Sequence, residues 1–422
     1  MPSSSTIALI IMAVTIVLYA TEKIPLAVTA LLSMLAMAFA GCISFSEAFA
    51  GFSNTATLMI IGAGIIGEAV FTTGLADRIG RLIMRMDRLT ETRFVLLAVT
   101  VSAILAAMMN AMIVMAIFMP IISAISAKTD GHITRKNTYL PIAIAAVFGG
   151  NLAVSGSTSM LNASAMLGES YYGRSLNYFE PLPFALPGLA VCLIIFGLTG
   201  CRLQERFFDF PEIRAEASTI SRETAEKPLW KQIFVVVDLA LCITAFAMGG
   251  NFGAVALTGG CLAIITGCIK MEEAIRGVSW NTVLIVAGTM GFAKGVEVSG
   301  AGQVIADVML ELCGPLSSSP YAMCVVMLVL GTVISNFMSN NATVGILVPI
   351  ALSLCSTLES DPVIYVLACA IGANLSVMTP ICTAAVTMTA SAGYRFKDYV
   401  RFGGLFNISA LVTTALVMRL HF

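Results

Sequence analysis

The sequence predicts an all-α polytopic membrane protein, built as an inverted repeat in which each half has five spans and one re-entrant hairpin. Its composition, its apolar segments and a repeat between its halves predict this fold. The chain has 422 residues, of which 58% are hydrophobic and 11% charged, and its mean hydropathy is +0.93. Soluble domains carry about 25% charged residues. Lipid must therefore surround most of this chain.

Ten apolar segments are candidate membrane spans, each of which needs about 20 largely apolar residues or fewer if its ends lie in the interface. They are 7–20, 25–40, 56–72, 139–167, 182–200, 233–249, 252–269, 281–296, 363–390 and 403–420. Two further stretches, 94–127 and 321–358, are too long for one span and too short for two. Polar residues break each of them near its middle, at 107–112 and 335–342. We therefore expect a re-entrant hairpin in each stretch, with its tip at the break.

The two halves of the chain resemble each other. Residues 46–80 align without gaps on 272–306, 110–120 on 339–349, and 149–154 on 372–377. Each half contains five spans, an odd number, so the second half must enter the membrane from the opposite side. This predicts a first repeat at 1–200, a linker at 201–231 and a second repeat at 232–422.

Basic residues indicate the orientation of these segments. If both hairpins return to the side they enter from, all but three of the 23 Lys and Arg residues lie on one side, the exceptions being Arg174, Lys294 and Arg419. This bias obeys the positive-inside rule, and it vanishes if each hairpin is a single crossing. We expect a bacterial-type inner membrane, both termini outside and residues 201–231 in the cytoplasm. A basic series is expected mainly to fix this orientation, although it could attract anionic lipid or substrate; it consists of Arg78, Arg81, Arg85 and Arg88.

Four irregular polar segments are expected to meet near the middle of the membrane. They are the two hairpin tips and the Gly-, Ser- and Thr-rich breaks at 149–159 and 372–383. Irregular backbone at this depth persists only against protein or a watery cavity. Freed carbonyls and side-chain oxygens suit a hard cation such as Na⁺, whereas exposed amides and helix N-termini suit an anion. The sequence thus predicts a pocket for a cation and an anion without a buried charge.

Six motifs follow one another along nearly the whole chain: SFSEAFAGFSNTATLMIIGAG, NAMIVMAIFMP, GGNLAVSGSTS, SWNTVLIVAGTMGFAKGVEVSGA, SNNATVGILVP and TPICTAAVTMTASAGYRFKDYVRFGG. Together they resemble the divalent anion/sodium symporter (DASS) family of the ion transporter superfamily, with its citrate-transporter-like permeases. The resemblance implies an elevator-type secondary transporter, usually a homodimer. It also implies that Ser-Asn-Thr tips and broken helices bind Na⁺ and substrate carboxylates.

The candidate site follows from this resemblance and from the repeat. The candidates for binding substrate are Asn110, Ser157, Thr158, Ser339, Asn340, Asn341, Thr379, Pro380 and Thr383. The candidates for binding Na⁺ are Asn110, Gly150, Asn151, Gly156, Ser335, Ser339, Asn340, Ala373 and Asn374. The first half departs from the family pattern, because Ala111 and Met112 stand where the second half has Asn340 and Asn341. We expect a weakened first cation site and fewer ions per transport cycle.

The expected function is Na⁺-coupled symport of a small di- or tricarboxylate or a similar divalent oxyanion. A proton-coupled anion permease and a Na⁺/H⁺ antiporter of the same superfamily remain alternatives, and a passive anion channel is a more distant one. We expect no enzyme, no transition metal and no cofactor besides the coupling ion, because the two histidines, His132 and His421, leave little for a metal site or a triad. The expected partners are the anion, membrane lipid and a second copy of the chain. A net charge of −1 disfavours nucleic acid.

Three ionisable residues fall inside or close to apolar segments. Glu68 and Lys294 occupy equivalent positions in the repeat, and Asp238 lies within the segment 233–249. Residues of this kind are functional candidates that could hold the transport core or lie near a gate, but we interpret each as a side chain that reaches the interface from a helix end. The sequence Ser53-Asn54-Thr55 matches the tip motif literally, yet it opens a span, and we interpret it as a helix N-cap.

Overall fold

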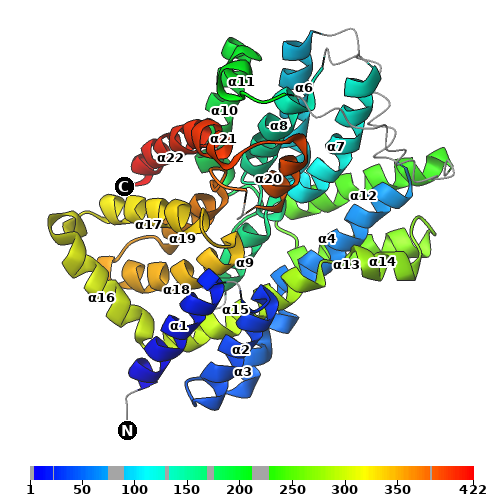
Figure 1. Ribbon diagram of the computed structural model, residues 1–422. Coiled ribbons are helices and arrows are strands. Elements are labelled where there is room, and N and C mark those ends of the chain that lie inside the picture. Colours follow the sequence, from blue (N-terminus) through cyan, green and yellow to red (C-terminus); the bar gives the residue numbers. More distant parts are fainter. Residues whose placement is uncertain are drawn as a thin grey trace.

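The computed structural model describes residues 4–21, 23–74, 90–128, 133–168, 175–211, 228–380 and 383–422, and within these ranges it is helical without a strand (Figure 1). Most of the predicted linker and the predicted basic series at 78–88 lie outside the described residues. In the first half the main helices are α1 (Ser4–Thr21), α2 (Leu26–Phe39), α3 (Phe45–Phe49), α4 (Thr55–Thr72), α6 (Glu91–Met108), α7 (Ala111–Lys128), α8 (Arg135–Gly149), α9 (Thr158–Leu167) and α10 (Leu182–Thr199).

After α11 (Arg202–Phe207), the second half contains a corresponding series of helices. They are α12 (Leu229–Ala247), α13 (Phe252–Ile265), α14 (Met271–Gly277), α15 (Trp280–Val298), α16 (Ala301–Cys313), α17 (Pro320–Ser335), α18 (Asn340–Leu358), α19 (Pro362–Asn374), α20 (Ala384–Met388), α21 (Phe396–Asp398) and α22 (Gly404–Met418). Every predicted span coincides with one of these helices or with a broken pair of them.

Among the described residues, seven helices are long and apolar enough to cross a membrane, or up to eight if a bent pair counts as one span. That pair is α15 with the segment Ala301–Ser318, and its bend is 73°. This number is smaller than the ten predicted spans. The helices α2 and α13 have only 14 residues each, and two predicted spans are interrupted, between α8 and α9 and between α19 and α20. The arms α6 and α18 pass the test although we predicted that they belong to hairpins.

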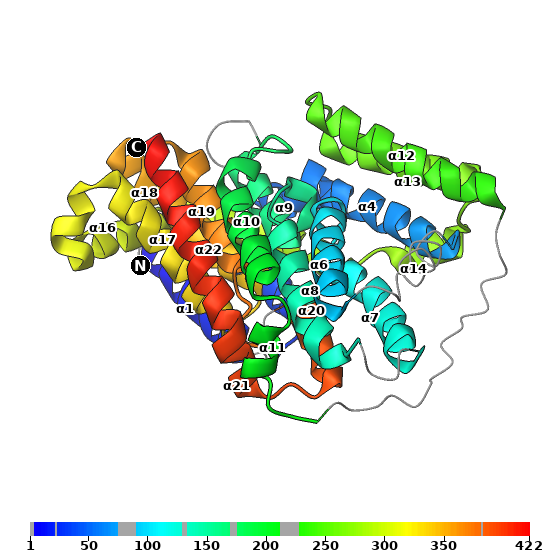
Figure 2. The ribbon, with the colours of Figure 1, turned by 90° about the horizontal axis from the view of Figure 1, so that it is seen from above.

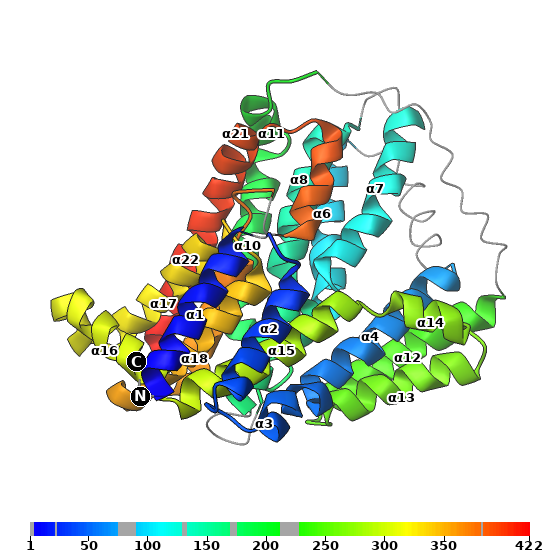
Figure 3. The same cartoon turned by 60° about the horizontal axis from the view of Figure 1, so that its bottom comes forward.

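The chain reverses its direction at both predicted tips. α6 and α7 are joined at Met109 and Asn110 and lie side by side (Figure 3). α17 and α18 are joined by residues 336–339 and also lie side by side (Figure 1). The polar tips therefore sit at the ends of helical hairpins.

The third predicted span of each half packs against the second span of the other half: α4 against α13 and α15 against α2. A Cβ added at Gly62 would lie 2.3 Å from the carbonyl carbon of Ala256, and one at Gly288 would lie 2.8 Å from that of Ala30. Gly62 aligns with Gly288, and Ala30 aligns with Ala256 at the same offset. The two contacts are therefore equivalent, as expected when two related halves exchange partners.

The hairpins and broken helices lie between two projecting ends of the molecule. Figure 2 shows α4, α12, α13 and α14 together at one end and α16 at the other. In the centre, every residue of α19 is buried, whereas α1 exposes more than half of Ile10, Val14 and Val17. An apolar outer surface around a buried polar centre fits an integral membrane protein.

Candidate functional site

Both predicted breaks interrupt a helix at the centre of the molecule. α8 ends at Gly149 and α9 begins at Thr158, while α19 ends at Asn374 and α20 begins at Ala384. A Cβ at Gly149 would lie 2.2 Å from the carbonyl oxygen of Ala103 on α6, and one at Gly372 would lie 2.4 Å from that of Leu328 on α17. Only glycine allows this approach, so each broken helix packs tightly on the first arm of the hairpin in its own half.

Asn374 connects the two halves. Its Nδ2 donates to Asn151 Oδ1 at 2.7 Å and to Ser157 Oγ at 2.7 Å. Its Oδ1 accepts from Asn340 Nδ2 at 3.1 Å and from Ser159 Oγ at 2.5 Å. These four bonds use the full capacity of one amide. Asn151 is the aligned counterpart of Asn374, so equivalent asparagines of the two repeats bond to each other.

Four oxygen atoms form a closed ring beside this amide. The hydroxyl oxygens of Ser335 and Ser376 each lie within hydrogen-bonding distance of both Asn340 Oδ1 and the carbonyl oxygen of Ala373, at 2.5 to 2.9 Å. A serine hydroxyl has one proton and can donate it to one acceptor at a time. Two protons therefore serve these four contacts, and a cluster of closely spaced oxygens is the environment that a hard cation prefers.

The loop after α19 is held in place by hydrogen bonds to Asn336 and to Thr387. Thr379 Oγ1 donates to the carbonyl of Asn336 at 2.7 Å, and the Met378 amide donates to Asn336 Oδ1 at 3.2 Å. The carbonyl of Pro380 accepts from Thr387. Thr379 and Pro380 thus shape the loop rather than line the cavity described below, whereas Thr383 lines it and accepts from Asn340 Nδ2 at 3.4 Å.

The first tip contains no such ring. Asn110 Oδ1 accepts from the amide of Met112 at 2.9 Å, so its carbonyl caps its own helix. The repeat pairs the ring residues Ser335, Asn340 and Ser376 with Ala106, Ala111 and Ala153. All three side-chain oxygens of the ring are therefore missing from the first half.

A cavity of about 620 Å³ opens beside the polar centre. One wall contains α4, α12 and α14, and the other contains both tips and the start of α9. Its size suits a small ligand. The predicted residues that line it are Asn110, Gly156, Ser157, Thr158, Ser339, Asn340, Asn341, Asn374 and Thr383.

The N-termini of α9 and α18 meet at this cavity. Asn341 Nδ2 donates to Thr158 Oγ1 at 3.1 Å, which joins the first turns of the two helices. Neither Ser157 nor Ser339 caps its helix with a side-chain hydrogen bond. Free amides at two converging N-termini favour an anion.

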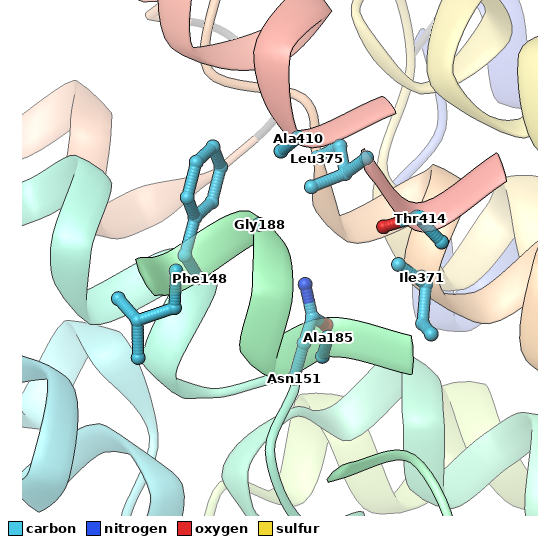
Figure 4. A pocket seen from close by; sticks show the side chains of 9 residues that line it. Phe148, Asn151, Ala185, Gly188, Ile371, Leu375, Ala410 and Thr414 are labelled. Atoms are coloured by element: carbon cyan, nitrogen blue, oxygen red, sulfur yellow. The ribbon is translucent and has the colours of Figure 1, made fainter. Parts of the chain in front are cut away.

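The remaining predicted residues lie behind the cavity wall. Ser335 and Ala373 belong to the oxygen ring, and the Gly150 carbonyl lies so close to Gly156 that a Cβ there would be 2.4 Å away. Asn151 projects into a separate space of about 10 Å³ opposite Ile371 and Thr414 (Figure 4). That space is about the volume one water needs.

Sequence reasoning missed several polar residues of this centre, namely Ser159, Asn336, Ser376 and, on the opposite wall of the cavity, Arg276. Ser159 and Ser376 lie inside the two predicted breaks, 149–159 and 372–383. Their position in a glycine- and serine-rich interruption was a usable signal. Nothing in the sequence places Arg276 at the cavity, because its position depends on how α14 packs against α4.

The charged residues behave differently from one another. Lys294 forms an ion pair with Glu297 at 3.3 Å, and both remain about a quarter exposed. Glu68 lines the cavity, although Lys294 is its repeat counterpart. The interpretation that the Asp238 side chain reaches the interface is wrong. Asp238 lies in the middle of α12, is only 4% exposed and packs against Gly259 of α13. Its Oδ2 is buried without a hydrogen-bond partner. Asn54 caps α4 by accepting from the Ala56 amide, as predicted.

Comparisons with known proteins agree with this architecture. A family model described as citrate transporter matches residues 16–344 and 243–422. An uncharacterized transporter of Synechocystis sp., sll0640, is 31% identical over 160 residues, which are 37% of this chain but only 26% of that protein. The sodium-dependent high-affinity dicarboxylate transporter 3 of Caenorhabditis elegans is 24% identical over 466 residues, with 95% of this chain and 80% of the relative covered. The crystal structure of the Alcanivorax borkumensis YdaH transporter has the same fold, with a TM-score of 0.51, 14% identity and coverage of 99% and 98%.

Proposed function

Because the chain belongs to the citrate transporter family, we propose that this membrane transporter couples the inward movement of Na⁺ to the uptake of a small di- or tricarboxylate or a similar divalent oxyanion. The relative in Caenorhabditis elegans is described as a sodium-dependent dicarboxylate transporter. Its distant similarity supports the choice of ion and substrate class. The geometry of the polar centre supports it independently.

The oxygen ring of Ser335, Asn340, Ala373 and Ser376 carries the proposal. It brings four oxygens within hydrogen-bonding distance of one another, and Ser335, Ala373 and Ser376 are buried while Asn340 borders the cavity. Oxygen atoms of hydroxyls, amides and carbonyls are the ligands that a hard cation takes, so a Na⁺ ion could be coordinated at the ring. Because Asn340 also lines the cavity, the cation would lie next to the anion, and each would favour the binding of the other.

The arrangement of the helices supports an elevator mechanism. The exchanged contacts of α4 with α13 and of α15 with α2 support an inverted repeat with halves at 1–200 and 232–422. These four helices would form a fixed scaffold. The hairpins and broken helices would move the bound ions past it, in a homodimer with both termini outside and residues 201–231 in the cytoplasm.

Transport by the purified protein in liposomes tests this function. Radiolabelled succinate should accumulate above its external concentration with an inward Na⁺ gradient and not with choline in place of Na⁺. Equal uptake without Na⁺ would contradict the coupling. Uptake driven by a proton gradient would show a proton-coupled permease, proton movement without succinate would show an antiporter, and flux without accumulation would show a channel.

A further inference from the structure

Among the described residues that line the cavity of about 620 Å³, only Glu68 and Arg276 carry a charge. Glu68 lies on α4 and Arg276 on α14, so both belong to the wall opposite the tips. The polar groups on the tips and on α9 are hydroxyls and amides. Of the described residues in the cavity wall, one is therefore cationic, and none of those on the tips or on α9 is.

The backbone at Arg276 is held firmly against this wall. The next residue, Gly277, packs so closely on α4 that a Cβ there would lie 2.4 Å from Glu68 Cβ and 3.1 Å from the Gly64 carbonyl oxygen. The Arg276 side chain is exposed and makes no hydrogen bond or ion pair with any other described residue. Its guanidinium donors are therefore available to a ligand in the cavity.

Amides and hydroxyls bind a monoanion and a dianion through the same hydrogen bonds. A full positive charge discriminates between them, because its Coulomb energy doubles when the ligand carries two negative charges. Arginine also matches a carboxylate with two parallel hydrogen bonds. A cation on the wall of a cleft further raises the local concentration of anions, an effect that salt weakens.

We propose that Arg276 binds the second acidic group of the substrate and thereby makes the cavity selective for dianions over monoanions. The inference rests on the proposed function, since the ligand is the transported anion. Glu68 lies on the same wall as Arg276, and its negative charge repels the anion, so it limits how strongly the anion is bound. Selection by charge thus belongs to the wall opposite the tips, while the tips bind the first acidic group and the cation.

Succinate and its monoanionic monoamide, succinamate, serve as probes of this role. We expect Arg276→Gln to raise the KM for succinate about tenfold, to leave the maximal rate and the KM for succinamate nearly unchanged, and to flatten the salt dependence of succinate uptake. Arg276→Lys should restore part of the loss. Glu68→Gln should act in the opposite direction and lower the KM. Arg206→Gln, at an exposed arginine of α11 outside the cavity, is the matched control and should change nothing.

Stabilisation of the detergent-solubilised protein by succinate, measured as a shift of Tm, separates this inference from the proposed function. A loss of the succinate shift in Arg276→Gln, with the succinamate shift unchanged, supports the role of Arg276 even if uptake is not driven by Na⁺. Equal succinate responses of Arg276→Gln and the unaltered protein would overturn it, whatever the coupling ion. An equal loss for both probes would also overturn it, since it would show a structural role.

Discussion

Removing one oxygen from the ring at the second tip should weaken Na⁺ binding without weakening anion binding. Ser376 suits this test because its side chain is buried in the ring and does not line the cavity. Ser376→Ala leaves three of the four oxygens. Losing one partner of a buried polar site costs about 1–3 kcal/mol, which corresponds to roughly 5- to 150-fold in an equilibrium constant. We expect the half-saturating Na⁺ concentration to rise by a factor in this range.

The assay is the initial rate of succinate uptake at increasing Na⁺. In Ser376→Ala the maximal rate and the KM for succinate should return to normal once Na⁺ is saturating. Ser353→Ala is the matched control, because Ser353 is buried on α18 and donates only within its own helix, to the Pro349 carbonyl at 3.1 Å. Its Na⁺ dependence should equal that of the unaltered protein.

The same titration counts the coupling ions. Since the counterparts of the ring residues in the first half are Ala106, Ala111 and Ala153, only one ring is available, and the Hill coefficient for Na⁺ should be close to one. An unchanged half-saturating concentration in Ser376→Ala would refute the assignment of the ring to Na⁺. A Hill coefficient near two in the unaltered protein would refute the argument that the first half has lost its cation site.

Three further variants test the centre and the scaffold. Asn340→Ala should abolish uptake, because it removes a ring oxygen and the bond to Asn374, whereas Ala111→Ser at the aligned position should be tolerated; active Asn340→Ala protein would disprove the site. Gly62→Leu should lower the Tm or prevent folding, because even its Cβ would lie 2.3 Å from the Ala256 backbone, and a normal Tm would contradict the close packing of α4 on α13. Asp238→Leu keeps the branched shape but removes a buried oxygen that has no partner. Burying such an oxygen costs about 1–3 kcal/mol of stability, so the variant should have a higher Tm and unchanged uptake. Lost uptake would instead assign Asp238 a function.

The positions of the helices and of the tips could be predicted from the sequence because lipid imposes a simple rule on composition. Apolar stretches must become helices, and a run such as Ser339-Asn340-Asn341 must lie against protein or a watery cavity. The Asn54 cap was predictable for a similar reason, since it depends on the next few residues alone. Such local features need no knowledge of what packs against them.

The features that could not be predicted depend on which helices meet. Asp238 lies on an apolar segment at a spacing that also fits a helix end, and only the packing of α12 on α13 shows that it is buried. Thr379 and Pro380 belong to a polar break, but their contacts with Asn336 and Thr387 hold the loop together, and neither residue lines the cavity. Arg276 comes to the cavity through the contact of Gly277 with Glu68, two residues far apart in the sequence.

The two halves differ in their polar residues, and this difference separates two features of the centre: the interruption of a helix and the ring of oxygen atoms. Asn151 and Asn374 are both present, and each is needed because the bond between them joins the halves at the point where both helices are interrupted. The three ring side chains of the second half align with three alanines in the first half, and an alanine side chain has no polar atom that needs a hydrogen-bond partner. The interruption of a helix and the proposed binding of a cation are therefore separable properties. The first half keeps the interruption, and under the proposed function it would offer its helix N-terminus to the anion and leave the cation to the second half.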